Sequence, residues 1–381
     1  MELSEIRNQL DHVDSELLRL FLERMALVDQ VADIKKETHQ PLYDPKRERE
    51  ILAKIHESSG ASYASSADQF FRTLLELSRA RQAAQLFIGS VAASRVAEMC
   101  AREQAVFPQT GRVACFGIEG SNAQMAADKL FPRGDLVFFD SFSAVVGAVK
   151  AGLCQFGVLP IENSSNGSVR AVYELLRTPD LSIVRGIRLK IRHVLLAQKG
   201  ADISQIRTIY THEQAAGQCN KFLSSLGGVD VVPCSSTAHA ARRAAEAHDP
   251  SVAAIASEAC AKLYGLRVAA DEIQNNPNND TRFLCITKGA VCYAGADRMS
   301  LVLSCENEAG ALFHTISKIS AHGINMCKLE SVSIPGTNFS YRFYVDLDAS
   351  IHQEGIVGLL SILEHSCESF QLLGNYSELI G

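Results

Sequence analysis

The chain has 381 residues, 47% of them hydrophobic and 21% charged, a composition typical of two or three globular domains. Lysine and arginine total 37 against 43 acidic residues, and like charges are not clustered, which argues against nucleic-acid or membrane partners. No apolar run approaches the roughly 20 residues of a membrane span, and the N-terminus lacks the pattern of a signal peptide. The cysteines and histidines follow no metal-binding spacing, so we expect reduced thiols, no metal, no cofactor and a cytoplasmic location.

The first hundred residues predict an all-α unit. From Leu3 to Lys36, apolar residues recur at alternating steps of three and four, at Ile6, Leu10, Val13, Leu17, Leu20, Leu27, Val31 and Ile34. A helix of this length spans about 50 Å and is too long to bury its stripe on one small domain. It therefore needs a partner helix, from this chain or from a second copy.

Two further helices follow in this unit. Asp44-Pro45 predicts an N-cap and a first turn, opening a helix that ends near Ser58. A third helix is expected from Ser66 through Leu86, and the run up to Gln104 still has helical character.

The pattern of apolar and polar residues changes after Phe107–Arg112, where a proline and a glycine mark a boundary. Short apolar strands then alternate with polar loops and helices, which predicts an α/β unit of two lobes around a cleft. Helix N-termini at the strand ends would favour anions such as carboxylates. From Met299 onward the expected order is βαββαβ, the pattern of a ferredoxin-like α+β domain.

Several cations lie on the apolar helices. Arg24 interrupts the stripe, and Lys35 shares its face to within about 20°, whereas Arg7 lies about 100° off that face and is expected to point at a neighbouring chain. Taken alone, Arg24 could snorkel or pair at a helix seam, and the run DPKRERE could be a solvated charged face. The combination of cations without matching carboxylates favours instead a pocket for a small dianion. Polar residues at helical spacing that could join it are Asp44, Arg47, Glu48, Ser78 and Gln82.

The segments IRNQLDHVDSELLRLFLERMALVDQVADIKK, DPKRERE and LLELSRARQ resemble the all-helical chorismate mutase family over residues 1 to about 90. The resemblance implies an intertwined dimer. It also implies that Arg24 and Arg47 hold the two carboxylates of the substrate, with Arg7 reaching in from the partner chain.

The same resemblance assigns residues to the reacting bond and to the ring hydroxyl of the substrate. Lys35 and Gln82 would bind the ether oxygen of the breaking C–O bond. Asp44 and Glu48 would orient the ring hydroxyl, and Ser78 would be a secondary contact. A pericyclic rearrangement needs no nucleophile or proton shuttle, so catalysis would come from holding the compact conformer and from preorganised donors.

Five blocks of the middle unit resemble prephenate dehydratase: VLPIENSSNGSV, IYTHEQAAGQC, the SST of VPCSST, AAIASEACAKLYGL and NNDTRFLCI. The resemblance implies a fold like that of periplasmic binding proteins and the loss of a ring hydroxyl with CO₂, without a cofactor. Thr281 would be the donor near the leaving hydroxyl, and Arg282 would support a carboxylate. The remaining substrate contacts it implies are Asn163, Ser164, Thr211 and Gln218.

Two residues of these motifs carry a further hypothesis, and one of them, Glu162, is also a predicted substrate contact. Glu162 is the carboxyl group among these motifs that could act as a proton source if burial favoured its protonated form. Thr211 could also form a capping box with Gln214, and both roles can hold together.

The middle unit also departs from the dehydratase pattern. Ser121-Asn122-Ala123-Gln124 replaces a run that usually holds further hydroxyls and an aromatic residue. Thr211 stands where serine is usual, and Asn275 where aspartate is common. An alternative is therefore an active mutase carrying a degenerate dehydratase-like domain that only binds an aromatic acid. A non-enzymatic, helically dimerised anion sensor is a second alternative, which the complete set of cations disfavours.

The C-terminal unit resembles the ACT regulatory domain. Its motif Glu308-Ala309-Gly310-Ala311-Leu312 opens a helix where the family binds phenylalanine between subunits. A second motif begins with Glu330 and Ser331 but continues with Val332-Ser333 in place of arginine and proline. Use of this unit for dimerisation alone is the other possibility.

The predicted domains are a chorismate mutase domain at 1–92, a helical linker at 93–111, a prephenate dehydratase domain at 112–290 and an ACT domain at 299–378. Together these resemblances predict a bifunctional chorismate mutase/prephenate dehydratase that is a homodimer or a higher homo-oligomer. Its substrates would be chorismate and prephenate, and its feedback effector phenylalanine.

Overall fold

A computed structural model describes residues 2–38, 40, 44–86, 90–307, 310–334, 336 and 340–381. The chain divides into two compact units. Unit 1 contains Met1–Ala97 and Leu301–Leu372, and unit 2 contains Glu98–Ser300 and Leu373–Gly381. Each unit is therefore assembled from two separate stretches of chain.

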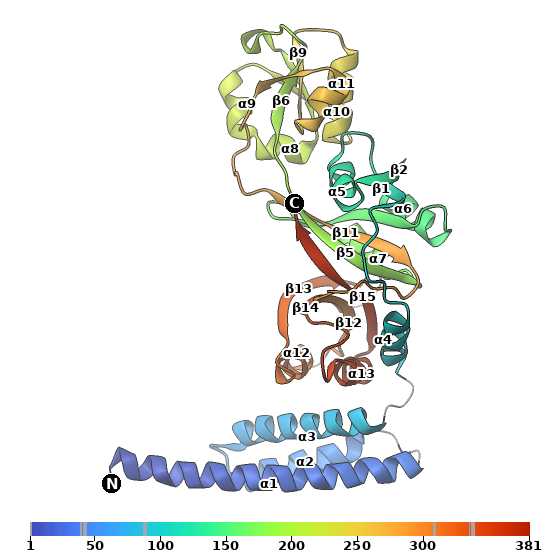
Figure 1. The fold of residues 1–381 in the computed structure, drawn as a ribbon. Coiled ribbons are helices and arrows are strands. Elements are labelled where there is room, and N and C mark those ends of the chain that lie inside the picture. The colour runs from blue at the N-terminus through green and yellow to red at the C-terminus, as the bar shows by residue number, and fades with distance from the viewer. Residues whose placement is uncertain are drawn as a thin grey trace. The chain divides into compact units, whose positions relative to one another are not determined.

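The N-terminal part of unit 1 is helical, as predicted, with α1 at Leu3–Thr38, α2 at Pro45–Ser58, α3 at Ala64–Leu86 and α4 starting at Val91 (Val91–Ala101) (Figure 1). Asp44 is the N-cap of α2, and its Oδ1 accepts a hydrogen bond from the Arg47 amide at 3.0 Å. This cap confirms the start expected from Asp44-Pro45.

α1 leaves its apolar stripe uncovered in the single chain. Its buried residues are Met25, Val28 and Ala32, on the side that packs against α3. All eight stripe residues named above are exposed, from 41% at Ile6 to 57% at Ile34. α1 also extends beyond α2 and α3 toward its N-terminus (Figure 1). The expectation that one small domain cannot bury this helix is confirmed.

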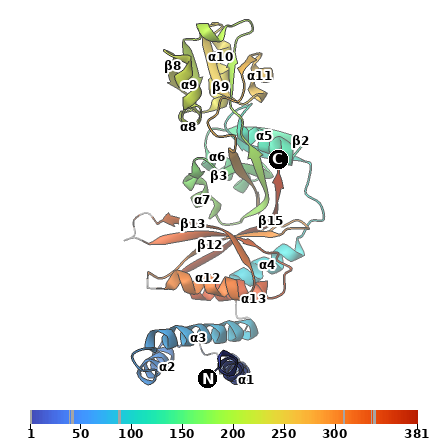
Figure 2. The ribbon, with the colours of Figure 1, turned by 90° about the vertical axis from the view of Figure 1, so that its left-hand side faces the viewer.

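The second stretch of unit 1 has the predicted βαββαβ order. Its elements are β12 (Arg298–Ser304), α12 (Ala311–Ala321), β13 (Asn325–Ser333), β14 (Tyr341–Asp348), α13 (Ile356–Ser366) and β15 (Ser369–Ile380), and the strand order is β13-β14-β12-β15. α12 and α13 lie on one side of these strands (Figure 2). α13 begins at Ile356 rather than at the expected Ile351, because Gly355 adopts a left-handed conformation with φ of 80° at its start.

The first lobe of unit 2 is a mixed sheet in the order β5-β11-β3-β1-β2, in which β11 is antiparallel to both of its neighbours, and the end of β15 runs parallel to the outer side of β5. Val113, Phe131, Val158 and Phe283 are among its core residues. Its elements are β1 (Thr110–Phe116), α5 (Asn122–Leu130), β2 (Arg133–Phe139), α6 (Phe142–Lys150), β3 (Phe156–Asn163), β4 (Gly167–Ser168), α7 (Arg170–Leu176), β5 (Leu181–Lys190) and β11 (Asp280–Lys288).

The second lobe is a five-stranded sheet in the order β10-β6-β9-β7-β8, with a buried cluster on each face. Its elements are β6 (Val194–Ala197), η1 (Ile203–Gln205), β7 (Thr208–Thr211), α8 (Glu213–Gln218), α9 (Asn220–Leu226), β8 (Asp230–Pro233), α10 (Thr237–Glu246), β9 (Val252–Ala256), α11 (Ala259–Tyr264) and β10 (Arg267–Ala270). Two connections join the lobes, β5 to β6 and β10 to β11 (Figure 1). The predicted two-lobed α/β unit is confirmed.

Within the described ranges, no helix has the length and apolarity needed to cross a membrane. The same residues contain no group of three or more His, Cys, Asp or Glu side chains placed to hold a metal ion.

Candidate functional site

The helical segment brings Arg24 and Ser78 into contact. The half-buried Arg24 donates from Nη1 to the Ser78 hydroxyl and, at 3.4 Å, to the Leu74 carbonyl. Burial lowers the pKa of the Arg24 guanidinium, although an arginine stays protonated in proteins. Asp29 of α1 also binds Arg81 of α3 through two hydrogen bonds of 2.5 and 2.7 Å. Residue numbers rise together in the two contacts, from 24 to 29 on α1 and from 78 to 81 on α3, so the two helices run parallel.

Lys35 faces the N-terminal turn of α2. Burial lowers the pKa of its ammonium, while the nearby carboxylates of Asp44 and Glu48 raise it. Glu48 also forms an ion pair with Arg79 of α3. The sequence reasoning missed Arg79, although it lies in the LLELSRARQ segment directly after Ser78. Three helices thus contribute alternating charges to one small region.

Gln82 follows Ser78 by one helical turn on α3, on the same face. It is only 8% exposed, and its Oε1 is buried without a hydrogen-bond partner among the described residues. Leaving a buried polar group unpaired costs about 1–3 kcal/mol. Gln82 therefore has hydrogen-bonding capacity available for a ligand or for another chain.

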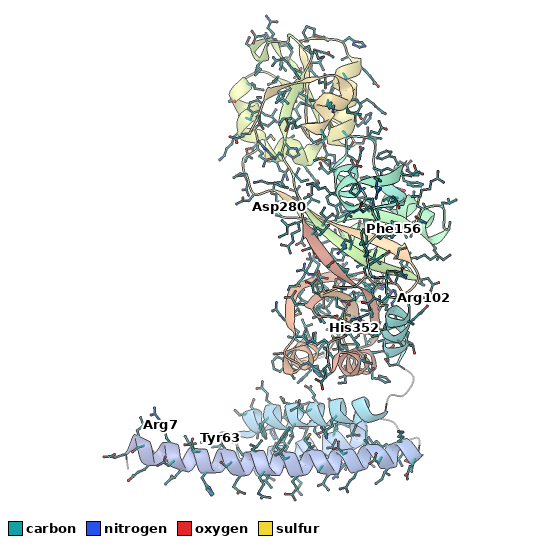
Figure 3. All side chains as sticks on the ribbon, viewed as in Figure 1. Arg7, Tyr63, Arg102, Phe156, Asp280 and His352 are labelled. Atoms are coloured by element: carbon teal, nitrogen blue, oxygen red, sulfur yellow. The ribbon has the colours of Figure 1, made fainter. Side chains whose placement is uncertain are left out.

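Two predicted members of this site lie elsewhere. The Arg47 side chain is 68% exposed and pairs with Glu50 at 3.5 Å, one turn along α2. Arg7 is exposed near the N-terminal end of α1, about 25 Å along the helix from Arg24 at 1.5 Å per residue (Figure 3). A single chain therefore does not bring Arg7, Arg24 and Arg47 together.

In unit 2, a hydrogen-bonded group forms where β3 ends and β11 begins. The antiparallel register places Thr281 opposite Asn163. Asn163 Nδ2 donates to Thr281 Oγ1 at 2.9 Å and to Asn279 Oδ1 at 2.8 Å. Because Thr281 Oγ1 accepts this bond, its own hydrogen can be donated elsewhere.

This group continues to Gln218 at the end of α8. Gln218 Oε1 accepts from Asn279 Nδ2 at 3.1 Å and lies 2.9 Å from His193 Nε2. The shared acceptor assigns the proton to Nε2. Burial lowers the pKa of His193, which favours the neutral ring, and its Nδ1 has no hydrogen-bond partner within the described chain. The sequence reasoning missed His193 and Asn279. Asn279 lies in the NNDTRF motif, whereas no motif marks His193.

Ser164 and Thr211 are engaged by the backbone. Ser164 Oγ accepts from the Asp280 amide at 2.9 Å and donates to the Asn278 carbonyl at 3.2 Å, which shapes the approach to β11. Thr211 is fully buried, and its hydroxyl donates to the Ile255 carbonyl at 3.1 Å.

The predicted Thr211 capping box is wrong. β7 extends through Thr211, so the N-cap of α8 falls one residue later, at His212. His212 Nδ1 accepts the hydrogen bond from the Gln214 amide at 3.3 Å.

Arg282 turns away from Thr281, because successive residues of a strand face opposite sides of the sheet. It is 8% exposed, forms an ion pair with Glu378 and donates from Nη2 to the Tyr376 hydroxyl at 2.8 Å. The support that the resemblance assigned to a substrate carboxylate is thus directed at a carboxylate of β15. Glu162, half-buried on β3, is the register partner of Arg282.

The divergent loop after Gly120 is a helix cap. Ser121 is the N-cap of α5 and accepts from the Gln124 amide at 3.3 Å, while Gln124 Oε1 accepts from the Gly120 amide at 2.7 Å. This pair is similar to a capping box, except that the Gln124 side chain binds the amide of Gly120, the residue before the N-cap. Gly120 has φ of +85°, and a Cβ there would lie 2.8 Å from Cys260 Sγ. The loop is therefore packed against the SEACAKLYGL segment.

Asn275, which stands where aspartate is common in the dehydratase pattern, forms hydrogen bonds through its side-chain amide group. Its Nδ2 donates to the Gly217 carbonyl at 3.2 Å and to Asn220 Oδ1 at 2.8 Å. Its Oδ1 accepts from the Lys221 amide at 3.3 Å. An ionised aspartate could not donate these bonds, which explains asparagine at this position.

The predicted effector residues lie on two neighbouring elements. Gly310 is left-handed at the start of α12, followed by Ala311 and Leu312, and α12 packs on β13. Glu330 and Ser331 lie in β13. Glu308 and Ala309 fall outside the described residues. Val332, which replaces the family's arginine, is buried.

Two family models match the chain. Residues 6–83 match chorismate mutase type II, and residues 113–290 match prephenate dehydratase. The first range contains the helical residues described above, and the second contains the hydrogen-bonded group around Asn163 and Thr281.

Two solved structures resemble 70% of this chain, each with a TM-score of 0.64. Prephenate dehydratase from Arthrobacter aurescens, in complex with L-Phe, is 28% identical and 90% covered. A protein described as GqqA, a novel type of quorum quenching acylase, is 26% identical and 97% covered. Since one fold carries differently described activities, site residues have to carry the functional argument.

A full-length relative joins both family matches in one chain. The bifunctional chorismate mutase/prephenate dehydratase of Enterobacter agglomerans is 31% identical over 384 residues, which cover 98% of this chain and 95% of the relative. The Escherichia coli (strain K12) protein with the same name is also 31% identical, with 98% and 96% covered. With both domains matched in this order, the chain belongs to the bifunctional chorismate mutase/prephenate dehydratase family.

Proposed function

We propose that this chain converts chorismate to prephenate in its helical segment and prephenate to phenylpyruvate in unit 2. The observation that carries the proposal is the presence, in one chain, of two separate polar groups suited to these two reactions. One is the half-buried cationic group around Arg24 and Lys35. The other is the hydrogen-bonded group around Asn163 and Thr281.

The first reaction moves electrons within one molecule, so the protein has to bind, orient and stabilise charge. Arg24 offers a partly desolvated guanidinium to a carboxylate of the substrate. Lys35 and Gln82 bind the ether oxygen as the C–O bond breaks and negative charge grows on it. Burial strengthens these interactions relative to the same interactions in water.

The second reaction breaks two bonds and yields phenylpyruvate, CO₂ and water. The electron pair released by loss of CO₂ enters the ring as the ring hydroxyl departs, and that hydroxyl requires a proton. Thr281 donates to the departing oxygen, since Asn163 already occupies an acceptor site of its hydroxyl. The proton comes from solvent in this scheme. Glu162, the candidate proton source from the sequence, is the register partner of Arg282 and so lies on the face of the sheet opposite Thr281, which does not support that role. We therefore expect a Glu162→Gln enzyme to dehydrate prephenate at an unchanged rate.

A second copy of the chain completes the helical site in this proposal. The exposed stripe of α1 supplies the contact surface, and burial of one leucine contributes roughly 1.5–3 kcal/mol. Arg7, too distant from Arg24 in its own chain, reaches the site of the partner. Residues of the partner chain would also donate a hydrogen bond to Gln82 Oε1, or would hold Gln82 where it contacts the substrate.

Phenylalanine is the proposed effector, bound by the C-terminal βαββαβ element as an ACT domain. The support is the βαββαβ order, the placement of Gly310–Leu312 at the start of α12, and the L-Phe complex of the Arthrobacter aurescens relative. The domain limits 1–92, 112–290 and 299–378 and the cytoplasmic location remain predictions.

The test gives the purified protein chorismate and follows prephenate and phenylpyruvate separately, with and without phenylalanine. We expect prephenate to appear transiently, phenylpyruvate to follow, and phenylalanine to suppress it. Prephenate that accumulates without phenylpyruvate would refute the dehydratase activity and leave a mutase with an aromatic-acid-binding domain. Absence of both products would refute the proposal as a whole.

A further inference from the structure

We propose that Glu378, on the last strand, is a positioning residue for the dehydratase reaction: it holds the start of β11, and with it Thr281, by binding Arg282. This inference rests on the proposed dehydratase activity and adds residues to it from a part of the chain outside the dehydratase match at 113–290. All the residues involved belong to unit 2.

Glu378 lies at the centre of three arginines. Its Oε1 binds Arg282 Nε, and its Oε2 binds Arg188 Nε at 2.7 Å and Arg298 Nη1 at 2.8 Å. The side chains of Glu378 and Arg282 are 8% and 9% exposed. One carboxylate thus balances three cations, and its removal takes a charge partner from a buried guanidinium.

Tyr376 holds the other side of Arg282. Its hydroxyl accepts from Arg282 Nη2 at 2.8 Å and lies 2.8 Å from Ser300 Oγ. Tyr376 is fully buried. Arg282 is therefore bound at both ends of its planar group by alternate residues of β15, which fixes its orientation.

Gly186 makes this contact possible. β5 lies between β15 and β11, and Gly186 is the register partner of Glu378. A Cβ at Gly186 would lie 3.2 Å from Glu378 Cγ and Oε1 and 3.3 Å from Tyr376 Cε2. Because Gly186 has no side chain, Glu378 and Tyr376 can lie across β5 and reach Arg282 on the far strand.

Glu378 and Tyr376 thus hold Arg282, which directly follows Thr281 in β11. β11 begins at Asp280, where the chain enters from the polar connection between the lobes (Figure 3). Its pairing with β5 is regular from Asp280 to Cys285, but its pairing with β3 shifts between Arg282 and Phe283, so on the side of Asn163 the strand start is not in one register with the rest of β11. Arg282 anchors this start from one face of the sheet while Thr281 meets Asn163 on the other. Loss of the anchor displaces the Thr281 hydroxyl from the place where the substrate hydroxyl leaves.

The experiment compares four variants of the full chain: Glu378→Gln, Glu378→Asp, Gly186→Ala and the control Glu246→Gln. Glu246 is an exposed residue of α10 that pairs with Arg242. Prephenate turnover gives kcat and KM, and chorismate turnover by the same sample reports on the helical segment. Circular dichroism at the assay temperature gives the folded fraction. Gly186→Ala changes no polar group and tests the same geometry if Glu378→Gln folds poorly.

We expect Glu378→Gln to lower the dehydratase kcat by about 10- to 100-fold with KM changed by less than about threefold, as for a misplaced catalytic group. Glu378→Asp should recover part of that loss, and Gly186→Ala should reproduce it in part. The control should retain full dehydratase activity, and every variant should retain mutase activity. In an Arg282→Met background, Glu378→Gln should cost little further kcat, because Glu378 acts through Arg282.

A kcat within twofold of the parent in folded Glu378→Gln and Gly186→Ala enzymes would overturn the inference. A loss that follows only the folded fraction, or full additivity with Arg282→Met, would also overturn it by showing a merely structural role. A parent chain that forms no phenylpyruvate would refute the dehydratase activity itself. These outcomes distinguish the absence of a positioning role for Glu378 from the absence of the proposed dehydratase activity.

Discussion

The helical segment and unit 2 place polar groups in apolar surroundings, but they satisfy them differently. In the helical segment Gln82 keeps a buried oxygen without a partner in the described chain, and the α1 stripe is exposed. In unit 2 the side chains of Asn163, Asn279 and Gln218 bind one another within a single chain. In our proposal the first site is completed by assembly, whereas the amide side chains of the second bind one another within one chain, although His193 Nδ1 beside them also lacks a partner among the described residues.

This difference teaches how each site tolerates change. A site completed by a second chain fails when its contact surface is altered at a distance. A site built on paired strands fails when the register or a strand anchor is altered.

The largest effect is expected from charge on the stripe. Leu10→Glu combined with Leu17→Glu should convert the protein to a monomer and lower mutase activity by more than about 100-fold, because carboxylates would have to be buried between copies. Dehydratase activity should remain. Light scattering and the two assays measure these outcomes, and Leu22→Glu, on an exposed face away from the stripe, is the control. A stable dimer in the double variant would contradict the assembly argument.

Arg24→Ala should come next. Loss of the guanidinium that contacts Ser78 removes a charged donor from the helical site, and mutase kcat should fall by about 10²–10³-fold, or about 2.7–4 kcal/mol. Dehydratase turnover should be unchanged. Arg19→Ala is the matched control, since Arg19 is 58% exposed and pairs with Glu16 and Glu23 along the helix. Equal losses in the two variants would contradict a specific role of Arg24.

Thr281→Val makes the reciprocal test in unit 2. The variant keeps the shape of the side chain but removes the hydroxyl that accepts from Asn163, so dehydratase kcat should fall by about 100-fold. Mutase activity should be retained. Thr287→Val, on the same strand, removes a hydroxyl that binds the Gln155 carbonyl and should leave dehydration nearly unchanged. Turnover of prephenate measures both, and a Thr281→Val enzyme at parental rate would exclude the donor role.

The smallest effect is a shift in pH dependence. Burial lowers the pKa of Lys35, and Glu48 raises it. Because Lys35 acts in its protonated form, mutase activity should fall as pH rises through the pKa of Lys35 in the folded protein. Glu48→Gln removes a raising influence, so this alkaline limb should move to lower pH. Mutase pH profiles measure the shift, with Glu50→Gln, an exposed partner of Arg47, as the control. A shift to higher pH would reverse the assigned electrostatics.

The sequence was most informative where local pattern and burial agree. The heptad-like spacing predicted α1 and its uncovered stripe, and Asp44-Pro45 predicted a helix start. The resemblance to prephenate dehydratase assigned Asn163 and Thr281 to one substrate site, and the two side chains are in contact. Arg282 could not be placed in this way, because its partner Glu378 is 96 residues away and reaches it only across Gly186.

The missed residues share one physical reason. His193 is defined by burial and by the Gln218 oxygen, and Arg79 by the Glu48 carboxylate of another helix. Neither contact leaves a trace in local spacing. Arg47 shows the converse: its spacing next to Asp44 and Glu48 suggested a shared pocket, but in the single chain it pairs with Glu50.

The division of the chain also sets an order of events during synthesis. Unit 2 takes its last strand segment from Leu373–Gly381, and Leu301–Leu372 of unit 1 comes between that segment and the rest. Since a ribosome adds roughly 5–20 residues per second from the N-terminus, the helices can form long before Glu378 exists. During that interval Arg282 has no carboxylate from β15, so the nascent dehydratase unit is unfinished. A ribosome stalled before residue 373 would therefore hold a chain whose helices α1, α2 and α3 are complete but whose dehydratase unit lacks the strand segment that carries Glu378.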